Sequence, residues 1–362
     1  MIRMKDISKS LILATLAIVT PITGFSNEVA IKVGFVYVGP VGDAGWTFQH
    51  DLARKQLEKA FGNKLSTQFV ESVHEGADAE RVIREMARSG CKVVFTTSFG
   101  YMNPTLKVAR AFPNTVFMHA TGYKTAHNVG IYNARFYEGR YLNGVMAGCM
   151  TKTNIAGVVA ALPIPEVVMG INAFTRGMRS VNKNAKVKVI WTNAWFNPGR
   201  EREAASALIA QGADVLTHHT DSTATIQIAE EKHVMAFGHT SNEAKYGPHA
   251  QLSGTMHIWG GFYIKTVNDV LANRWNSTST WGGFSQNMVA LAPFNTKVPK
   301  ELRDRVTRLK RQIISGRLHP FAGPIFNQSG KEMVPAGVTI SDDELGRMNY
   351  FVYGVESKLP NT

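Results

Sequence analysis

The sequence alternates short apolar segments with helix-like segments, and it does so in two successive series. The first series begins at Ile31–Val38 and ends with the helix-like segment Tyr137–Met150. The second begins at Ile155–Leu162 and ends with the apolar segment Val234–Gly238. Strands separated by helices of this length pair in parallel through right-handed crossovers. The pattern therefore predicts an α/β protein with two doubly wound parallel-sheet lobes.

Three connections between the lobes are expected, because strand-like and helix-like segments continue after the second series. We place them near Ala134–Tyr137, Leu252–Met256 and Gly283–Val289. Such connections form a hinge, and a hinged two-lobed protein closes around a ligand that lies between its lobes. The predicted division gives residues 27–136 and 255–285 to the first lobe and residues 137–254 and 286–362 to the second.

The first 26 residues have the composition of a secretory signal peptide. Residues 1–9 carry three basic side chains, and residues 10–25 are mostly apolar and uncharged. Gly24 and Ser26 are small residues that fit cleavage near Ser26, and no cysteine lies there to carry a lipid anchor. A retained membrane anchor is the alternative, but the apolar stretch is short for a membrane span. We expect a mature protein that is exported to the periplasm.

The formal net charge of +13 raises the question of binding to nucleic acid or to an anionic surface. The basic residues are scattered, however. Their densest run, residues 300–311, contains acidic residues and has helical spacing, which is typical of a solvated helix face. No nucleic-acid partner is predicted.

Metal chemistry finds little support in the sequence. Cys91 and Cys149 are the two cysteines, and no paired Cys or His spacing indicates zinc. His218 and His219 are adjacent in a predicted strand, so their side chains point to opposite faces and cannot bind one ion together. We expect no metal, no cofactor, and two separate buried thiols, although an exported protein could also form a disulfide.

Polar and aromatic residues follow the carboxyl ends of the predicted strands, where open α/β sheets bind ligands. The candidate ligand-binding residues are Asp43, Trp46, Ser98, Phe99, His119, Trp195, Asp221, Ser222, His239 and His257. Trp46 and Trp195 belong to opposite lobes, which predicts a flat ligand held between two indoles. Asp43 is expected to accept a hydrogen bond from an amine or ring N–H of that ligand.

Each of these residues also has a structural interpretation. The two tryptophans suit core packing, Asp43 and Asp221 suit helix capping, and His257 suits an interface. The set contains no nucleophile, base and orienting group in one arrangement, and no carboxylate cluster for a metal. It therefore predicts a binding protein rather than an enzyme, since binding needs only shape, stacking and hydrogen bonds.

Several short motifs, taken in order, resemble the basic-membrane-protein (BMP) family of ABC-transporter substrate-binding proteins. The resemblance spans about residues 30 to 358, and its motifs are Val38–Trp46, Thr97–Gly100, Ile164–Val167, Gln211–Val215, His219–Ser222 and Trp259–Tyr263. It implies a periplasmic-binding-protein type I fold, an inner-membrane ABC permease as partner, and a purine nucleoside or base as ligand. It also implies that Trp46 and Trp195 stack on the base.

Two positions depart from the nucleoside-binding members of that family. Many of those members have an acidic residue where this chain has His239–Asn242, and a lysine where it has His257. Both family residues bind ribose, so the resemblance implies a free purine base here. We therefore predict a monomeric, exported protein that delivers a purine to its permease. A sugar-binding protein on the same fold, a nucleosidase-type enzyme and a ligand-sensing domain are the alternatives.

Overall fold

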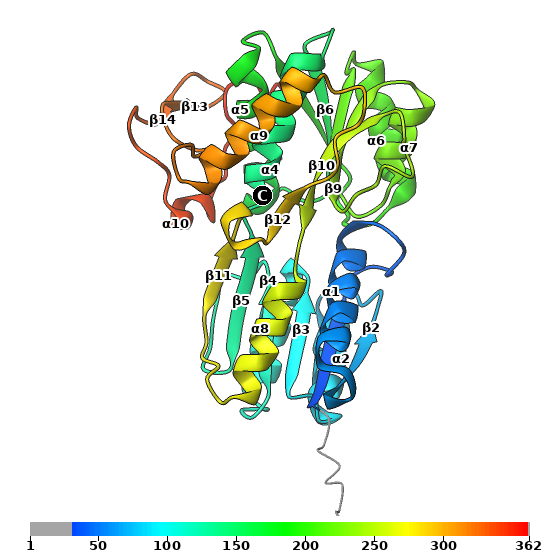
Figure 1. Cartoon of the computed structure of the whole chain (residues 1–362), viewed down its shortest axis with the longest axis vertical. Coiled ribbons are helices and arrows are strands. Elements are labelled where there is room, and N and C mark those ends of the chain that lie inside the picture. The colour runs from blue at the N-terminus through cyan, green and yellow to red at the C-terminus, as the bar shows by residue number, and fades with distance from the viewer. Residues whose placement is uncertain (1–30, 361–362) are drawn as a thin grey trace, which may run out of the picture.

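The computed structural model describes residues 31–360 and contains two six-stranded sheets, one in each of two lobes (Figure 1). The predicted α/β fold of two doubly wound lobes is confirmed. The expected signal peptide, residues 1–26, lies outside the described residues. Within the described part of the chain, no helix combines the length and the apolar character needed to cross a membrane.

The first sheet is entirely parallel, with the strand order β11-β5-β4-β3-β1-β2. Its strands are β1 Ile31–Tyr37, β2 Leu65–Val70, β3 Val93–Thr97, β4 Val116–Ala120, β5 Val129–Ala134 and β11 Ser279–Gly282. Two pairs of helices in mutual contact accompany it, α1 with α8 and α2 with α3. These helices are α1 Gly45–Phe61, α2 Ala77–Arg88, α3 Met102–Ala109 and α8 Gly260–Leu271. Every residue of β3 is buried, as expected for a central strand covered on both faces.

The second sheet has the order β12-β10-β9-β8-β6-β7 and is parallel except for β12. Its strands are β6 Ile155–Ala160, β7 Lys186–Trp191, β8 Val215–His219, β9 Met235–Thr240, β10 Gln251–His257 and β12 Val289–Leu291. Its helices are α4 Tyr137–Met150, α5 Pro165–Val181, α6 Pro198–Ala210, α7 Ala224–Glu231 and α9 Lys300–Ile314. The predicted charged helix at residues 300–311 is α9, which buries Leu302, Val306 and Ile313.

The C-terminal segment adds a small hairpin, β13 Ile325–Phe326 and β14 Glu332–Val334, and the short helix α10 Asp342–Leu345. It then returns to the second sheet, where Val355 forms a parallel bridge with Val187 of β7. Asn172 of α5 holds the same segment, because its side chain donates to Tyr350 O at 2.7 Å and accepts from Val352 N at 3.0 Å.

The chain passes between the two sheets after β5, after β10 and after β11. The second connection follows His257, because Thr255 and Met256 still pair with β9. The connection expected near Leu252–Met256 thus begins just after that stretch, since residues 251–257 form a full strand of the second sheet. The predicted lobe limits stay a prediction.

The two cysteines are both unpaired. Cys91 is buried before β3, as expected, and burial raises the pKa of its thiol. The expectation of a buried Cys149 was wrong, because this residue is exposed near the end of α4.

Helices α4 and α5 pack at a distance that glycine alone permits. A Cβ atom on Gly177 would lie 2.0 Å from the carbonyl oxygen of Tyr141, and one on Gly144 would lie 2.0 Å from that of Phe174. Carbonyl oxygens belong to the helix backbone and cannot rotate away, so the two helices would have to separate to admit a methyl group.

We predict that Gly177→Ala lowers the free energy of unfolding by about 2–3 kcal/mol, because overpacking forces the backbone to move. Gly261→Ala is the matched control, since Gly261 lies in α8 and a Cβ atom added there would meet nothing within 4 Å. The control is expected to be neutral or to stabilise by up to about 1 kcal/mol. Urea denaturation of both variants tests this, and equal stabilities would contradict it.

Candidate ligand-binding site

A cavity of about 30 Å³ lies where residues of both lobes meet. It is lined by Val38, Trp46, Ser98, Phe99, Thr121, Glu166, Trp195, His219, Asp221 and His239. A second cavity of about 210 Å³ shares Phe99, Thr121 and Glu166 with it, so the two cavities are neighbours in one cleft. Six of the ten candidate residues line the smaller cavity: Trp46, Ser98, Phe99, Trp195, Asp221 and His239.

Trp46 is the second residue of α1. Its side chain packs in the core and also lines the smaller cavity. It is 9% exposed, and its indole Nε1 donates to Thr97 O at 2.7 Å. Its ring packs edge-on against His257 and Trp259, with centroids 5.6 and 5.9 Å away. Trp46 therefore packs in the core and also lines the smaller cavity, while its contact with a ligand stays a prediction.

Trp195 follows β7 and comes from the second lobe. Its Nε1 donates to Glu75 Oε1 at 3.3 Å, and the same oxygen accepts from Ser98 Oγ at 2.6 Å and from Gly100 N at 2.9 Å. Glu75 lies just before α2, so its carboxylate links the indole of one lobe to a loop of the other. The sequence analysis did not identify Glu75, although it lies a few residues after the carboxyl end of β2.

Asp43 lies outside both cavities. Its carboxylate accepts hydrogen bonds from Lys245 Nζ and Tyr246 Oη of the second lobe, and the bond from Lys245 is the main cause of a lowered Asp43 pKa. The capping interpretation is wrong, since the N-cap of α1 is Ala44. Asp43 joins the lobes at the edge of the cleft, and its expected contact with the ligand stays a prediction.

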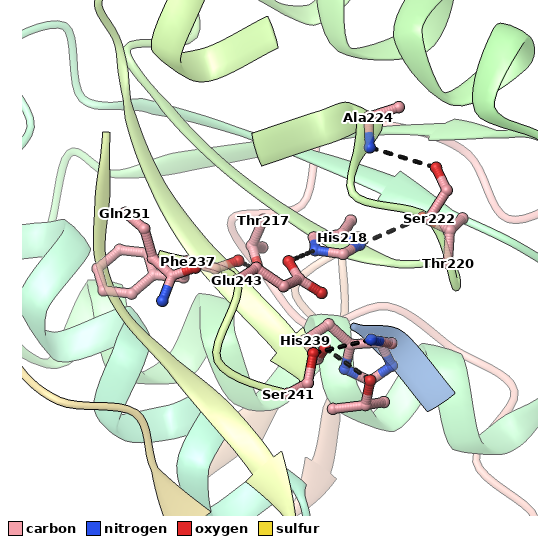
Figure 2. A network of polar contacts seen from close by, with 12 residues as sticks. Thr217, His218, Thr220, Ser222, Ala224, Phe237, His239, Ser241, Glu243 and Gln251 are labelled. Atoms are coloured by element: carbon pink, nitrogen blue, oxygen red, sulfur yellow. Dashed lines mark hydrogen bonds and ion pairs between the residues drawn. The ribbon is translucent and has the colours of Figure 1, made fainter. Parts of the chain in front are cut away.

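Asp221 lines the cavity, whereas its neighbour Ser222 supports the wall behind it. Burial, with a further contribution from nearby carboxylates, raises the pKa of Asp221 well above its usual range. Ser222 donates to Glu201 Oε2 at 2.6 Å. It accepts from Ala224 N at 3.3 Å, as Figure 2 shows. The N-cap of α7 is Thr223 rather than Asp221.

The candidate histidines have different positions. His119 is buried and bonds Ser98 O through Nε2 at 2.8 Å, and His257 is buried behind Trp46, so neither lines a cavity. His239 does line the smaller cavity, together with His219, which the sequence analysis considered only as a metal ligand. His218 points to the other face of β8, where it bonds Glu243 Oε2 at 2.9 Å (Figure 2).

Glu166 is a cavity residue that the candidate set omits. It is the second residue of α5, and burial raises the pKa of its carboxyl group to about 7. Its contacts are long, 3.4 Å from Oε2 to Asn133 Nδ2 and 3.8 Å from Oε1 to His219 Nε2. The carboxyl end of β6 lies a few residues upstream, so the rule used for the other strands could have found Glu166.

The lobes also touch at Gly45, the first residue of α1. Its backbone N–H donates to Ser241 Oγ at 2.8 Å, and a Cβ here would lie 2.4 Å from Asp221 O. Together with the Asp43 and Glu75 contacts, this makes one side of the cleft a continuous lobe-to-lobe seam.

The arrangement suits binding of a ring with polar edges. Indoles offer flat apolar faces, while Glu166, Asp221 and two imidazoles offer hydrogen-bonding groups. Within residues 31–360, no cluster of three or more His, Cys, Asp or Glu side chains is placed to hold a metal ion.

Comparisons with known proteins agree with this geometry. The structure matches a solute-binding protein of an ABC transporter system from Aeropyrum pernix with a TM-score of 0.70 and 17% identity, covering 87% of this chain and 95% of that one. The profile of the Bmp family, described as ABC transporter substrate-binding protein PnrA-like, matches residues 30–319. The chain therefore belongs to the Bmp family of ABC-transporter substrate-binding proteins, as its motifs indicated.

Two relatives align over most of their length. A purine-binding protein of Brucella abortus is 52% identical over 333 residues, which cover 92% of this chain and 95% of the relative. A Haloferax volcanii ABC-transporter protein, whose name assigns it glucose as ligand, is 37% identical, with 93% and 83% covered. Proteins of this family bind a small ligand and an ABC permease.

We predict that Gly45→Ala prevents full closure, because its methyl group would collide with the Asp221 backbone. Gly42→Ala is the control: Gly42 also has a positive φ, but its Cβ would meet nothing within 4 Å. Both variants place an alanine at positive φ, 53° at Gly42 and 89° at Gly45, so the control also carries backbone strain. Small-angle X-ray scattering should show a larger radius of gyration for Gly45→Ala alone, and identical curves would contradict the prediction.

Proposed function

We propose that this substrate-binding protein binds a purine base between Trp46 and Trp195 and delivers it to its ABC permease. The observation that carries the proposal is a cavity in which indoles from opposite lobes meet the carboxyl groups of Glu166 and Asp221. Stacking a base on one aromatic ring contributes about 1–3 kcal/mol. Two rings thus supply a large part of the roughly 8 kcal/mol needed for micromolar affinity.

The size of the cleft bears on how the ligand fits. The space of about 30 Å³ beside the indoles holds only one or two waters, so a purine ring also needs the adjoining 210 Å³ or a wider separation of the lobes. Hinged lobes supply that separation. The ligand therefore enters an opened cleft and is enclosed as the lobe-to-lobe seam forms.

The polar groups favour a base over its nucleotide or nucleoside. The carboxyl oxygens of Glu166 and Asp221 can accept hydrogen bonds from an amine or ring N–H, and a phosphate has no N–H to offer them. His257, at the position where family members use a lysine for ribose, is buried behind Trp46. The 52% identical purine-binding relative supports the same ligand class.

We also propose that residues 1–26 direct export to the periplasm, with cleavage near Ser26 and no lipid anchor, and that the mature protein is a monomer without catalytic activity or nucleic-acid binding. A sugar is the second candidate ligand, and the name of the Haloferax volcanii relative supports it. Indoles stack on sugar rings as well, so direct binding measurements must separate the two classes.

Adenine, guanine or hypoxanthine should raise the melting temperature of the mature protein. A ligand at 100 times its dissociation constant adds about 2.7 kcal/mol to the free energy of unfolding. AMP, ribose and glucose should give no shift at the same concentration. Stabilisation by glucose without any purine effect would favour the sugar-binding alternative.

Trp195→Ala should weaken purine binding by about 1–3 kcal/mol in isothermal titration calorimetry. Phe196→Ala is the matched control, because Phe196 is the next aromatic residue, is 43% exposed and does not line the cavity. Trp46→Ala should show the same loss with some destabilisation, since Trp46 also packs in the core. Unchanged affinity in both tryptophan variants would place the ligand elsewhere.

A further inference from the structure

Arg140 of α4 does not line the cavity, but its side chain contacts the cavity residue His239 at Nδ1. It is 2% exposed, and its guanidinium bonds Thr217 Oγ1 at 2.7 Å, the His218 carbonyl oxygen, and His239 Nδ1 at 2.7 Å. Burial lowers the pKa of Arg140 to about 9, so the group stays cationic at neutral pH.

The chemistry of this contact allows one assignment of the imidazole proton. A guanidinium has five N–H donors and no acceptor, so His239 Nδ1 must accept. Burial and the neighbouring Arg140 hold the pKa of His239 well below its usual range, and the ring is therefore neutral. A neutral imidazole whose Nδ1 accepts carries its proton on Nε2.

The backbone of His239 is fixed as well. Its carbonyl oxygen accepts from Ser241 N and from Thr240 Oγ1, both at 2.7 Å (Figure 2). His239 lines the cavity, and no hydrogen bond joins its Nε2 to another residue of the described chain. The ring edge that carries Nε2 is thus the edge left for a ligand.

We propose that Arg140 is a positioning residue that makes His239 an obligatory hydrogen-bond donor to the ligand through Nε2. The ligand must then present an acceptor, such as an unprotonated ring nitrogen or a carbonyl oxygen, opposite this atom. This inference rests on the proposed function. It adds that His239 Nε2 donates a hydrogen bond to an acceptor on the edge of the purine. Glu166 and Asp221 line the same cavity and offer carboxyl oxygens as hydrogen-bond acceptors.

Nitrogen-15 NMR of the imidazoles in the full mature chain, without ligand, tests the tautomer directly. His239→Gln identifies the His239 signals among the 11 histidines. The proposal expects a protonated Nε2 and an unprotonated Nδ1 at pH 7.5, with an Nδ1–H population appearing in Arg140→Met if that variant folds. A protonated Nδ1 in the parent chain would overturn the proposal regardless of the variants.

Calorimetry with adenine and its 1-deaza, 3-deaza and 7-deaza analogues tests the ligand side. Loss of one particular ring nitrogen should weaken binding about tenfold in the parent chain and in His239→Gln, whose amide N–H replaces Nε2–H. In His239→Leu, removal of the same ring nitrogen should no longer weaken binding. The same result is expected for His239→Asn, whose shorter side-chain amide does not reach the ligand. Identical deaza effects in all variants would overturn the proposal. If no purine binds the parent, the proposed function fails, while the NMR signal still decides the role of Arg140.

Discussion

The close packing of α4 on α5 is the constraint on which the ligand cleft depends. Glycines at the crossing bring the two backbones into contact, and each helix then carries one polar group to the cleft: α4 places Arg140 beneath His239, and α5 begins at the cavity with Glu166. A wider crossing would displace both groups relative to β8 and β9. The positions of polar groups in the cavity thus follow from backbone packing well below its surface.

The second lobe buries several ionisable groups, and some of them have hydrogen-bond partners in the fold. Arg140 has three acceptors, His218 bonds Glu243, and Ser222 donates to Glu201. A buried polar group without a partner costs more than a hydrogen bond contributes on balance, so this network fixes side-chain positions firmly. The carboxyl group of Glu166 has only long contacts to other residues. Burial raises the pKa of Asp221. These two carboxyl groups are therefore the ones best placed to gain from a ligand with N–H donors.

The local sequence pattern predicts the elements well because parallel strands buried on both faces are continuously apolar and the helices between them are amphipathic. The rule that ligands bind at the carboxyl ends of strands located Trp46, Trp195 and His239 in the cavity. It did not distinguish Asp221, which lines the cavity, from Ser222, which supports its wall. Adjacent residues after a strand point in different directions, and only the packed neighbours determine which of them faces the cleft.

The sequence by itself determined the two-lobed α/β fold, the family, and one cavity-lining tryptophan from each lobe. These features follow from periodicity and from short contiguous motifs. The tertiary structure decided what individual polar groups do. Asp43 meets Lys245 from 202 positions away, and Arg140 reaches His239 across 99 positions. Such contacts depend on how one lobe sits on the other and on how closely two helices cross. No local pattern records these distances, because they arise only when the whole chain has packed.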